Sequence, residues 1–465
     1  MSNQLKANSL SFFESLVMGI AGSAPGYTIA VTTAVLIATA GKLSPGALVI
    51  FAVPMLGIAV AYKALSKLDV SAGAAYQWTT VACGKFMGFL SGWALLLASM
   101  VFMVTGSIPV ATATLDFIDP ALAGNVFLTA AVASAWFLVV ASVLITGIEI
   151  TSRVQLVMTG VELVILAVVL VAALVHAAHA GPANPFSLSW FGFGYTPGSF
   201  AASALAVIFF YWGWDVTANL GEETIGGGDS AGNGGFSSVF VTIFFYIGFT
   251  LAALFLFSLK DARNLTDNII YNMAVVAGLG HAGGLLASVA VILSSIATLE
   301  TTMLQFSRTL FAMGRDGAMP RMFGVVGEKT QTPVRAMYLL MAVGLALVWA
   351  SSLMPSVNAI IASSVNAVAI LVAYYYGLAG LVAAWVFRLT YRLSLLRWLG
   401  LCLFPALSAL MLIGLGLYAI TTFSLVTKIV GLGGFVAGVV FFRPSRYTVE
   451  DPLAPSTVAS SRADA

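Results

Sequence analysis

The sequence predicts an all-α membrane protein with twelve transmembrane helices, ten of which form two inverted repeats of five. Three observations lead to this prediction. Of the 465 residues, 60% are hydrophobic and only 8% are charged, against about 25% charged in ordinary soluble domains. Apolar stretches long enough to cross a bilayer recur along the whole chain. The first and the sixth of these stretches are interrupted by glycine, proline or acidic residues.

Each apolar stretch approaches or exceeds about 20 residues, the length that crosses the hydrocarbon core of a membrane. The stretches cover 13–40, 44–63, 86–116, 125–146, 150–176, 199–221, 236–258, 283–314, 334–353, 358–385, 395–420 and 424–442. We therefore expect a cytoplasmic N-terminus at 1–12, a first repeat at 13–176, an outer loop at 177–198, a second repeat at 199–385, two peripheral helices within 395–442 and a disordered cytoplasmic tail at 443–465. Short interfacial helices are expected within 177–198 and 266–278.

The distribution of Lys and Arg predicts the orientation, because cytoplasmic loops carry an excess of both. With the N-terminus inside, only Lys42, Lys260, Arg263 and Lys428 fall on the outer side, and the other 16 of the 20 basic residues fall on the inner side. The expected location is the cytoplasmic membrane, with both termini in the cytoplasm and membrane lipid around the helices.

Both interrupted stretches predict broken helices. The first contains GIAGSAPGYT, in which Pro25 lacks an amide hydrogen and Gly22 and Gly26 ease unwinding. The sixth contains YWGWDVTAN, with Gly213 and Asp215. Unpaired backbone at membrane depth is tolerated only where protein or a cavity surrounds it, and breaks at corresponding positions of two repeats indicate the binding site of a transporter. The alternative is that glycine and proline are simply commoner in membrane helices.

The two breaks predict a site for a zwitterion. Free amides around Ser23, Ala24 and Gly26 lie at a positive helix end, which suits a carboxylate. Free carbonyls near Phe209 and Phe210 suit an ammonium group.

Three segments resemble the amino acid–polyamine–organocation superfamily, of the amino acid permease type. AYKALSKLDVSAGAAYQWTTVACGKFMGFLSGW (61–93) is similar to the family segment that joins spans two and three. FFYWGWDVTANLGEET (209–224) is similar to its sixth span, and FSRTLFAMGRDGAMPRMF (306–323) to its signature after span eight. The chain departs from the pattern at Val70, where the family usually has proline, and at Ala74, where it often has glycine.

This resemblance implies a leucine-transporter-type fold, with helices 1 and 6 unwound at mid-membrane, and a substrate that carries an amino group. It places the carboxylate on residues 21–26, an aromatic gate at Phe209, side-chain selectivity at Leu96 and Met100, and a further gate in the run Tyr374 to Tyr376, with Tyr376 as its main candidate. The full set of expected substrate-binding residues is Ala21, Gly22, Ser23, Ala24, Gly26, Tyr27, Leu96, Met100, Phe209, Phe210, Trp212, Gly213 and Asp215.

An ionisable group at membrane depth costs free energy and therefore indicates a function. Glu162, near the middle of the fifth span, is the first candidate for coupling transport to an ion. Proton-coupled relatives often have lysine there, so the resemblance leaves the mechanism open. Glu162 either exchanges a proton or stays permanently protonated and bonded to a carbonyl. In the eighth span, Ser295, Thr298 and Glu300 are further coupling candidates. A hydroxyl face of Ser294, Thr298 and Thr301, which Glu300 does not share, either lines a sodium site or packs between helices.

Asp215 has three interpretations: partner of a cationic substrate, proton carrier, or buttress that bonds amides freed by the break. Glu222 and Glu223 lie at the cytoplasmic end of the sixth span and are expected to bind partners of an inner gate. Arg153 and Arg308 are candidate partners, which the sequence does not pair.

The expected function is a permease that moves an amino acid by alternating access, coupled to protons. The alternatives are a polyamine or other small amine as substrate, sodium coupling or exchange, and a sensor or partner-dependent subunit without net transport. An enzyme is not expected, since the chain has no HExxH motif, and a missing GxxxxGK[ST] argues against ATP-driven pumping. Charge rings or a filter loop would indicate a channel, and neither is seen. No cofactor, metal or nucleic acid is expected, and the choice between monomer and dimer stays open.

Overall fold

The computed structural model describes residues 4–265 and 269–442, and these residues form helices and no strand apart from one isolated bridge between Leu10 and Thr224. The predicted tail at 443–465 lies outside the described residues. The helices are α1 (Phe12–Ser23), α2 (Pro25–Ala40), α3 (Ser44–Leu68), α4 (Ala75–Cys83), α5 (Lys85–Ile118), α6 (Val126–Ile145), α7 (Ile148–Ala180), α8 (Pro197–Phe210), α9 (Val216–Asn219), α10 (Gly227–Leu256), α11 (Leu259–Asn264), α12 (Ile269–Ala274), α13 (Gly280–Arg315), α14 (Val334–Ser351), α15 (Val357–Val386), α16 (Leu395–Trp398), α17 (Phe404–Thr422), α18 (Leu425–Lys428) and α19 (Gly434–Ala437).

Nine of the described helical stretches are long and apolar enough to cross a membrane, so the chain is a multi-pass membrane protein. The first stretch, Phe12–Leu68, joins α1, α2 and α3 through the short turn η1 (Gly41–Leu43). Two shorter apolar helical stretches, Pro197–Phe210 and Leu425–Phe441, come in addition. The twelve crossings and the two repeats stay predictions.

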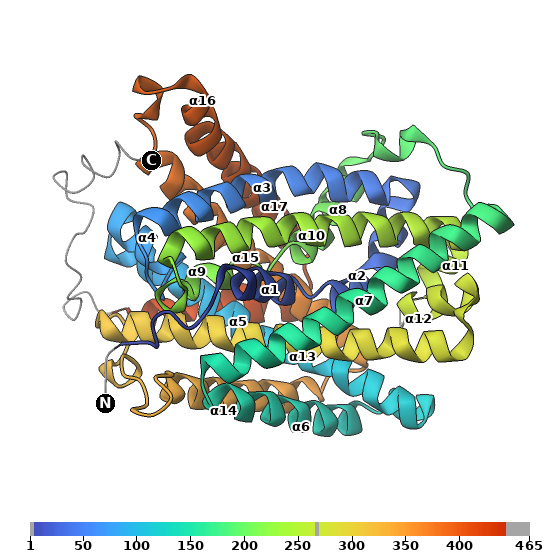
Figure 1. The fold of residues 1–465 in the computed structure, drawn as a ribbon, viewed down its shortest axis with the longest axis horizontal. Coiled ribbons are helices and arrows are strands. Elements are labelled where there is room, and N and C mark those ends of the chain that lie inside the picture. The colour runs from blue at the N-terminus through green and yellow to red at the C-terminus, as the bar shows by residue number, and fades with distance from the viewer. Residues whose placement is uncertain (1–3, 266–268, 443–465) are drawn as a thin grey trace.

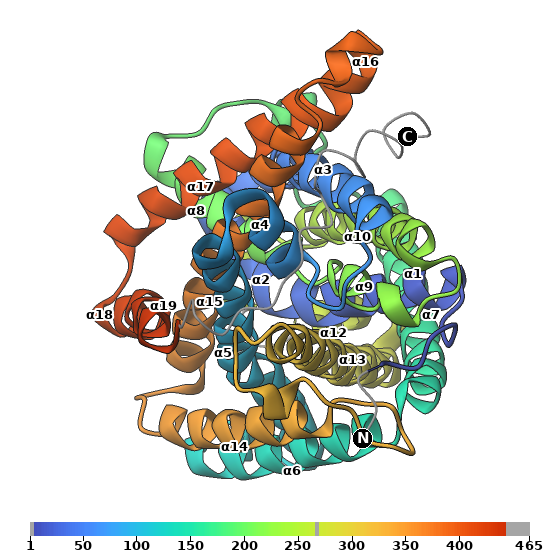
Figure 2. The same ribbon diagram turned by 90° about the vertical axis from the view of Figure 1, so that its left-hand side faces the viewer.

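The long helices run side by side along the molecule, and the short helices of the two broken segments lie among them (Figure 1). Seen along that axis, α2 and α9 lie in the middle, enclosed by α3, α10, α13, α5 and α15 (Figure 2). Helix α10 packs on α3 and α1, and α5 packs on α13 and α15. The arrangement places both helix breaks inside a shell of continuous helices.

Helix α7 shows how the faces divide in this bundle. Its outward face carries exposed valines, including Val157, Val164 and Val168, while its inward face buries polar residues, including Gln155 and Glu162. Because lipid is as apolar as the valines, polar groups are retained only where other helices surround them.

Short helices lie in both segments where interfacial helices were expected. Helix η3 (Leu188–Phe191) lies within 177–198 and buries Trp190. Helix α12 lies within 266–278, and the π turn η5 (Val275–Leu279) extends one residue beyond it; residues 266–268 are outside the described part of the chain.

Candidate functional site

The predicted break in the first span is confirmed and is one residue long. Helix α1 ends at Ser23 and α2 begins at Pro25, and Ala24 between them is left-handed, with φ 47°. The Ala24 amide donates to the carbonyls of Ile20 and Ala21, which caps α1. Proline suits the first position of a new helix because the amide it lacks would have no partner there.

The predicted break in the sixth span is also confirmed and is longer. Helix α8 ends at Phe210, and α9 begins only at Val216. Gly213, in the middle of the gap, has φ 101°, a conformation that a side chain strains.

The two breaks touch each other at glycine. A Cβ atom added to Gly22 would overlap the carbonyl oxygen of Gly213, and one added to Gly213 would overlap the carbonyl oxygen of Gly22. Only glycine on both sides allows the two backbones to come this close.

Glu162 of α7 reaches the first break and binds its backbone. The carboxylate oxygen Oε1 accepts the Gly26 amide at 2.9 Å, and Glu162 is fully buried. Ser294 of α13 lies beside the same amide. The expectation that Ala24 and Gly26 offer free amides is therefore wrong in this conformation, because Ala24 caps α1 and Gly26 holds Glu162. The physical reason is that an amide at a helix N-terminus attracts the nearest buried carboxylate.

Side chains of other helices hold the carbonyls at the end of α1. The Gly22 carbonyl accepts the Thr298 hydroxyl at 3.0 Å, and the Ser23 carbonyl accepts the Tyr246 hydroxyl at 2.7 Å. Thr298 thus lies at the break, which is compatible with both interpretations of the hydroxyl face. Ser295 instead donates to Val291 of its own helix at 2.8 Å.

At the second break, the structure differs from the expectation at one of the two carbonyls, that of Phe209. The Phe209 carbonyl accepts the amide of Trp212 at 3.3 Å, so it is not free. The Phe210 ring packs edge-on against Tyr246, with ring centroids 5.0 Å apart.

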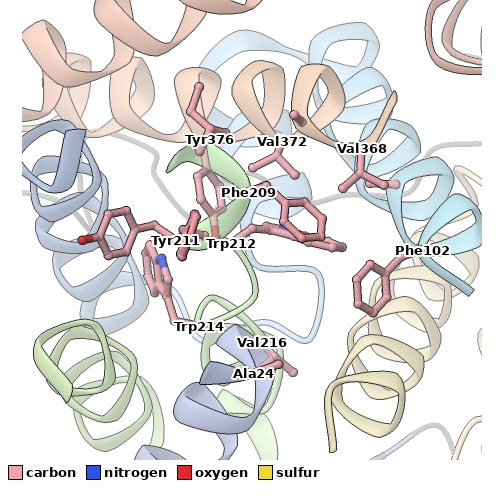
Figure 3. Close-up of a cluster of buried hydrophobic side chains, with 14 of the residues drawn as sticks. Ala24, Phe102, Phe209, Tyr211, Trp212, Trp214, Val216, Val368, Val372 and Tyr376 are labelled. Atoms are coloured by element: carbon pink, nitrogen blue, oxygen red, sulfur yellow. The ribbon is translucent and has the colours of Figure 1, made fainter. Parts of the chain in front are cut away.

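Asp215 is the centre of a buried hydrogen-bond network (Figure 3 labels Tyr376 and the neighbouring aromatic residues). Its carboxylate accepts from Gln305 of α13 at 2.7 Å, and from Tyr375 and Tyr376 of α15 at 3.0 and 2.8 Å. The Trp212 indole donates to the Tyr375 hydroxyl at 2.5 Å. This geometry corresponds to the buttress interpretation, except that the donors are side chains rather than freed amides.

Aromatic side chains gather around the second break (Figure 3). Phe102 of α5 meets Trp212 edge-on, with ring centroids 5.1 Å apart. Tyr27 lies 6.2 Å from Phe102 and 6.3 Å from Phe209 by the same measure. Val368 and Val372 of α15 lie on the side of the cluster away from Ala24 and Val216 (Figure 3). Apart from the Tyr27 hydroxyl and the Trp212 indole nitrogen, these side chains present an apolar surface.

The third-span residues expected to shape selectivity do not lie on this face. At about 100° per residue, Met100 is about 200° and Leu96 about 120° around α5 from Phe102. Leu96 is buried in the general core and Met100 is partly buried. The one-turn spacing found a helix face, but the tertiary structure turns a different face toward the break.

Glu300 lies about 200° around α13 from Thr298, which bonds the first break, and Tyr374 packs on α19. Glu300 is buried, and its Oε1 has no hydrogen-bond partner among the described residues. Tyr374 packs on Phe435 of α19, with ring centroids 4.8 Å apart. Of the tyrosine run in α15, only Tyr375 and Tyr376 reach the site.

Two ion pairs tie the end of the sixth-span segment to α13. Glu223 receives two hydrogen bonds from Arg308, both 2.9 Å, and the two side chains are fully buried. Glu222 receives two from Arg315, at 2.8 and 3.1 Å. Arg308 is confirmed as a partner of Glu223. Arg153, the other candidate, is exposed, and Arg315 instead pairs with Glu222.

Two functional candidates were missed by the sequence analysis: Phe102 and Gln305. Phe102 lies in an apolar helix, where aromatic residues are ordinary. Gln305 lies one residue before the family segment 306–323, and its polarity in a buried helix was the available signal. No cluster of three or more His, Cys, Asp or Glu side chains suited to a metal occurs in the described part of the chain.

Comparisons with known proteins agree with this architecture. The family model described as amino acid permease matches residues 10–442. A methylthioribose transporter of Bacillus subtilis (strain 168) is 26% identical over 363 residues, which cover 73% of this chain and 75% of the relative. A branched-chain amino acid permease of the same organism is 27% identical, over 70% of each chain. A vacuolar cationic amino acid transporter of Arabidopsis thaliana is 25% identical, over 79% of this chain and 64% of the relative.

The relatives are transporters rather than enzymes. Two broken helices that meet inside a helical bundle, together with a family match that spans nearly the whole chain, identify this protein as a member of the amino acid permease family, within the amino acid–polyamine–organocation superfamily.

Proposed function

We propose that this permease moves an amino acid with an uncharged side chain across the cytoplasmic membrane by alternating access, coupled to protons through Glu162. In this proposal twelve helices cross the membrane, 13–176 and 199–385 form the inverted repeats, and both termini are cytoplasmic. The ion pairs of Glu222 and Glu223 then belong to the inner side.

The observation that carries the coupling is the hydrogen bond between the Gly26 amide and Glu162. A carboxylate accepts a stronger hydrogen bond than a protonated carboxyl group does. Protonation of Glu162 therefore weakens its hold on the start of α2 and frees that helix end for the carboxylate of a substrate. Loss of the proton re-forms the bond, so proton and substrate exchange at one place.

The choice of substrate rests on Asp215 and the aromatic cluster. Asp215 is fully buried and already accepts three hydrogen bonds, so pairing with a cationic side chain would require it to give up part of this network. Phe102, Phe209 and Trp212 favour an apolar side chain. A relative named as a branched-chain amino acid permease fits this choice better than one named for cationic amino acids.

The test is proton-driven uptake by the purified protein in liposomes, after a thermal-shift screen against amino acids and small amines at two pH values, with and without sodium. We expect neutral amino acids to raise the melting temperature. Glu162→Gln is expected to abolish pH-driven uptake and to spare counterflow, since a side-chain amide does not take up or release a proton at these pH values. Glu149→Gln is the matched control, because Glu149 lies on the same helix with its side chain 47% exposed.

Each other outcome has a meaning. Stabilisation by polyamines alone would contradict the substrate class. If pH-driven uptake survives in Glu162→Gln, proton coupling through Glu162 is contradicted. Stimulation by sodium at constant pH would favour the hydroxyl of Thr298 beside the Gly22 carbonyl as a sodium ligand. Binding without uptake would indicate a sensor or a partner-dependent subunit.

A further inference from the structure

Polar residues follow the buried face of α7 from its first turns to Glu162. Ser152, Gln155, Thr159 and Glu162 are spaced three, four and three residues apart, so they share one face of the helix. All four are buried, with at most 2% exposed. We call these four residues the α7 polar stripe.

The stripe extends to one side of Glu162 only. From Glu162 to the end of the helix, the buried residues of α7 are all apolar: Leu166, Val169, Leu170, Ala173 and Ala177. The polar residues of the stripe are not there to pair with buried charges, since no salt bridge among the described residues involves them. On α7 itself, buried polar residues therefore lead from Glu162 toward the Ile148 end of the helix and not toward the opposite end.

Hydrogen bonds link parts of the stripe and bring it to the surface. The Ser152 hydroxyl donates to Glu14 of α1 at 3.1 Å, and Glu14 is partly exposed. The Gln155 amide nitrogen donates to the Thr159 hydroxyl at 3.1 Å. Beyond Glu14, the exposed pair of Lys6 and Glu149 lies at the same end of the helix.

Two acceptors within the stripe have capacity left. Gln155 Oε1 and Glu162 Oε2 are buried and have no hydrogen-bond partner among the described residues. Buried polar atoms are normally satisfied, and those that are not call for a ligand, a water molecule or a functional role. Around Glu162, the groups that face it from other helices are the Gly26 amide, Ser294 and Tyr246, and none of them carries a formal charge.

We propose that the α7 polar stripe is the path by which protons pass between Glu162 and the aqueous side at the Ile148 end of α7. This inference rests on the proposed function, in which Glu162 carries the coupled proton and that end faces the cytoplasm. The proton leaves the Glu162 carboxyl group for a water molecule held by Gln155 and Thr159. Each transfer breaks one O–H bond as the next forms, so Glu162 becomes a carboxylate and the cytoplasm gains one proton.

The experiment measures proton flux that accompanies substrate uptake, with a pH-sensitive dye enclosed in liposomes that contain the full-length protein. Gln155→Met and Thr159→Val keep side-chain volume and remove the polar atoms. We expect each to slow proton flux roughly tenfold, equivalent to a barrier raised by about 1.4 kcal/mol, while counterflow and the substrate-induced thermal shift stay as in the wild type. Thr159→Ser restores a hydroxyl and is expected to restore the flux.

Thr151→Val is the matched control, because Thr151 is buried on the same helix but its hydroxyl donates to the Gly147 carbonyl of its own chain segment, at 2.9 Å. Wild-type flux in both Gln155→Met and Thr159→Val would overturn the path while leaving the proposed function intact, provided that Glu162→Gln still abolishes uptake. An equal loss of counterflow and flux would also overturn it, because a packing role slows the whole cycle. Coupled uptake in Glu162→Gln would instead remove the proposed function itself.

Discussion

At the scale of single residues, the site depends on two glycines that oppose each other. Gly22 lies in the last turn of α1 and Gly213 lies in the gap of the second broken helix, and the backbone of each occupies the space where a side chain of the other would be. The contact makes the two breaks one structural unit.

Gly22→Ala is therefore expected to lower the free energy of unfolding by about 1–3 kcal/mol, the usual cost of overpacking, and to abolish uptake. Thermal unfolding in detergent and uptake in liposomes measure the two effects. Gly160→Ala is the control, since a Cβ there meets open space and the substitution favours the helix. Equal melting temperatures for the two variants would contradict the close approach of the backbones.

Asp215 illustrates how a residue's role is set by what surrounds it. An acidic residue in a transporter site suggests a bond to a cation. In the structure its carboxylate instead holds α13 and α15 against the second break through Gln305, Tyr375 and Tyr376. Its hydrogen bonds order the protein.

At the scale of elements, a ladder of polar contacts joins the sixth-span segment to α13. Asp215 and Asn219 bond Gln305, Asn219 also bonds Thr309, and Glu223 pairs with Arg308. The contacts recur every four residues on the sixth-span segment, and their partners on α13, Gln305, Arg308 and Thr309, lie within about one helical turn.

The Arg308 pair is expected to be the strongest rung. Arg308→Ala leaves Glu223 as a buried charge without a partner and is expected to lower the free energy of unfolding by about 3–5 kcal/mol. Arg315→Ala is expected to cost less, because the side chains of Arg315 and Glu222 are 33% and 19% exposed and solvent screens the pair. Chemical denaturation of both variants tests the order.

A double variant separates charge from packing. Replacing the pair by Arg308→Met and Glu223→Leu is expected to recover most of the stability that Arg308→Ala loses, since no uncompensated charge remains. If the double variant is as unstable as Arg308→Ala, the ion pair itself and not the isolated charge stabilises the ladder.

At the scale of the whole molecule, charged side chains collect at one end, where the α3–α4 connection meets the end of α13. Burial raises the pKa of Asp69 to about 6, Asp316 and Glu222 add to the rise, and Arg315 opposes it. The pKa of Asp316 is raised as well, mainly by burial. Among Asp69, Asp316 and Glu222, ionisation of the two aspartates therefore costs folding free energy, and the guanidinium of Arg315 offsets part of this cost.

This cluster predicts a pH dependence of stability. Since the folded pKa of Asp69 exceeds its ordinary value of 3.8, its favourable contribution is present below about pH 4 and is lost as the pH rises to about 6. Asp69→Asn cannot ionise and is expected to melt at a higher temperature than the wild type at pH 7, with a smaller difference at pH 4.5.

Melting curves between pH 4.5 and 7.5 measure this effect. The control is Asp229→Asn, at an exposed position outside the cluster, for which a parallel curve to the wild type is expected. A pH profile of Asp69→Asn that coincides with the wild type would contradict the assignment.

The sequence by itself determined the membrane class, the positions of both helix breaks and the family, because these depend on local chemistry. Pro25 and the neighbouring glycines weaken a helix wherever it lies, and a run of apolar residues needs no partner to favour lipid. The signature segments are likewise contiguous in the chain.

Only the tertiary structure decided what each polar group at the breaks binds. Gly26 meets Glu162 from 136 residues away, Asp215 meets Tyr376 from 161, and Arg308 meets Glu223 from 85. The face of α5 that carries Phe102, rather than that of Met100, was decided in the same way. Local periodicity finds the faces of a helix, but the packing of distant helices selects which face lies at the helix breaks, and so which atoms surround them.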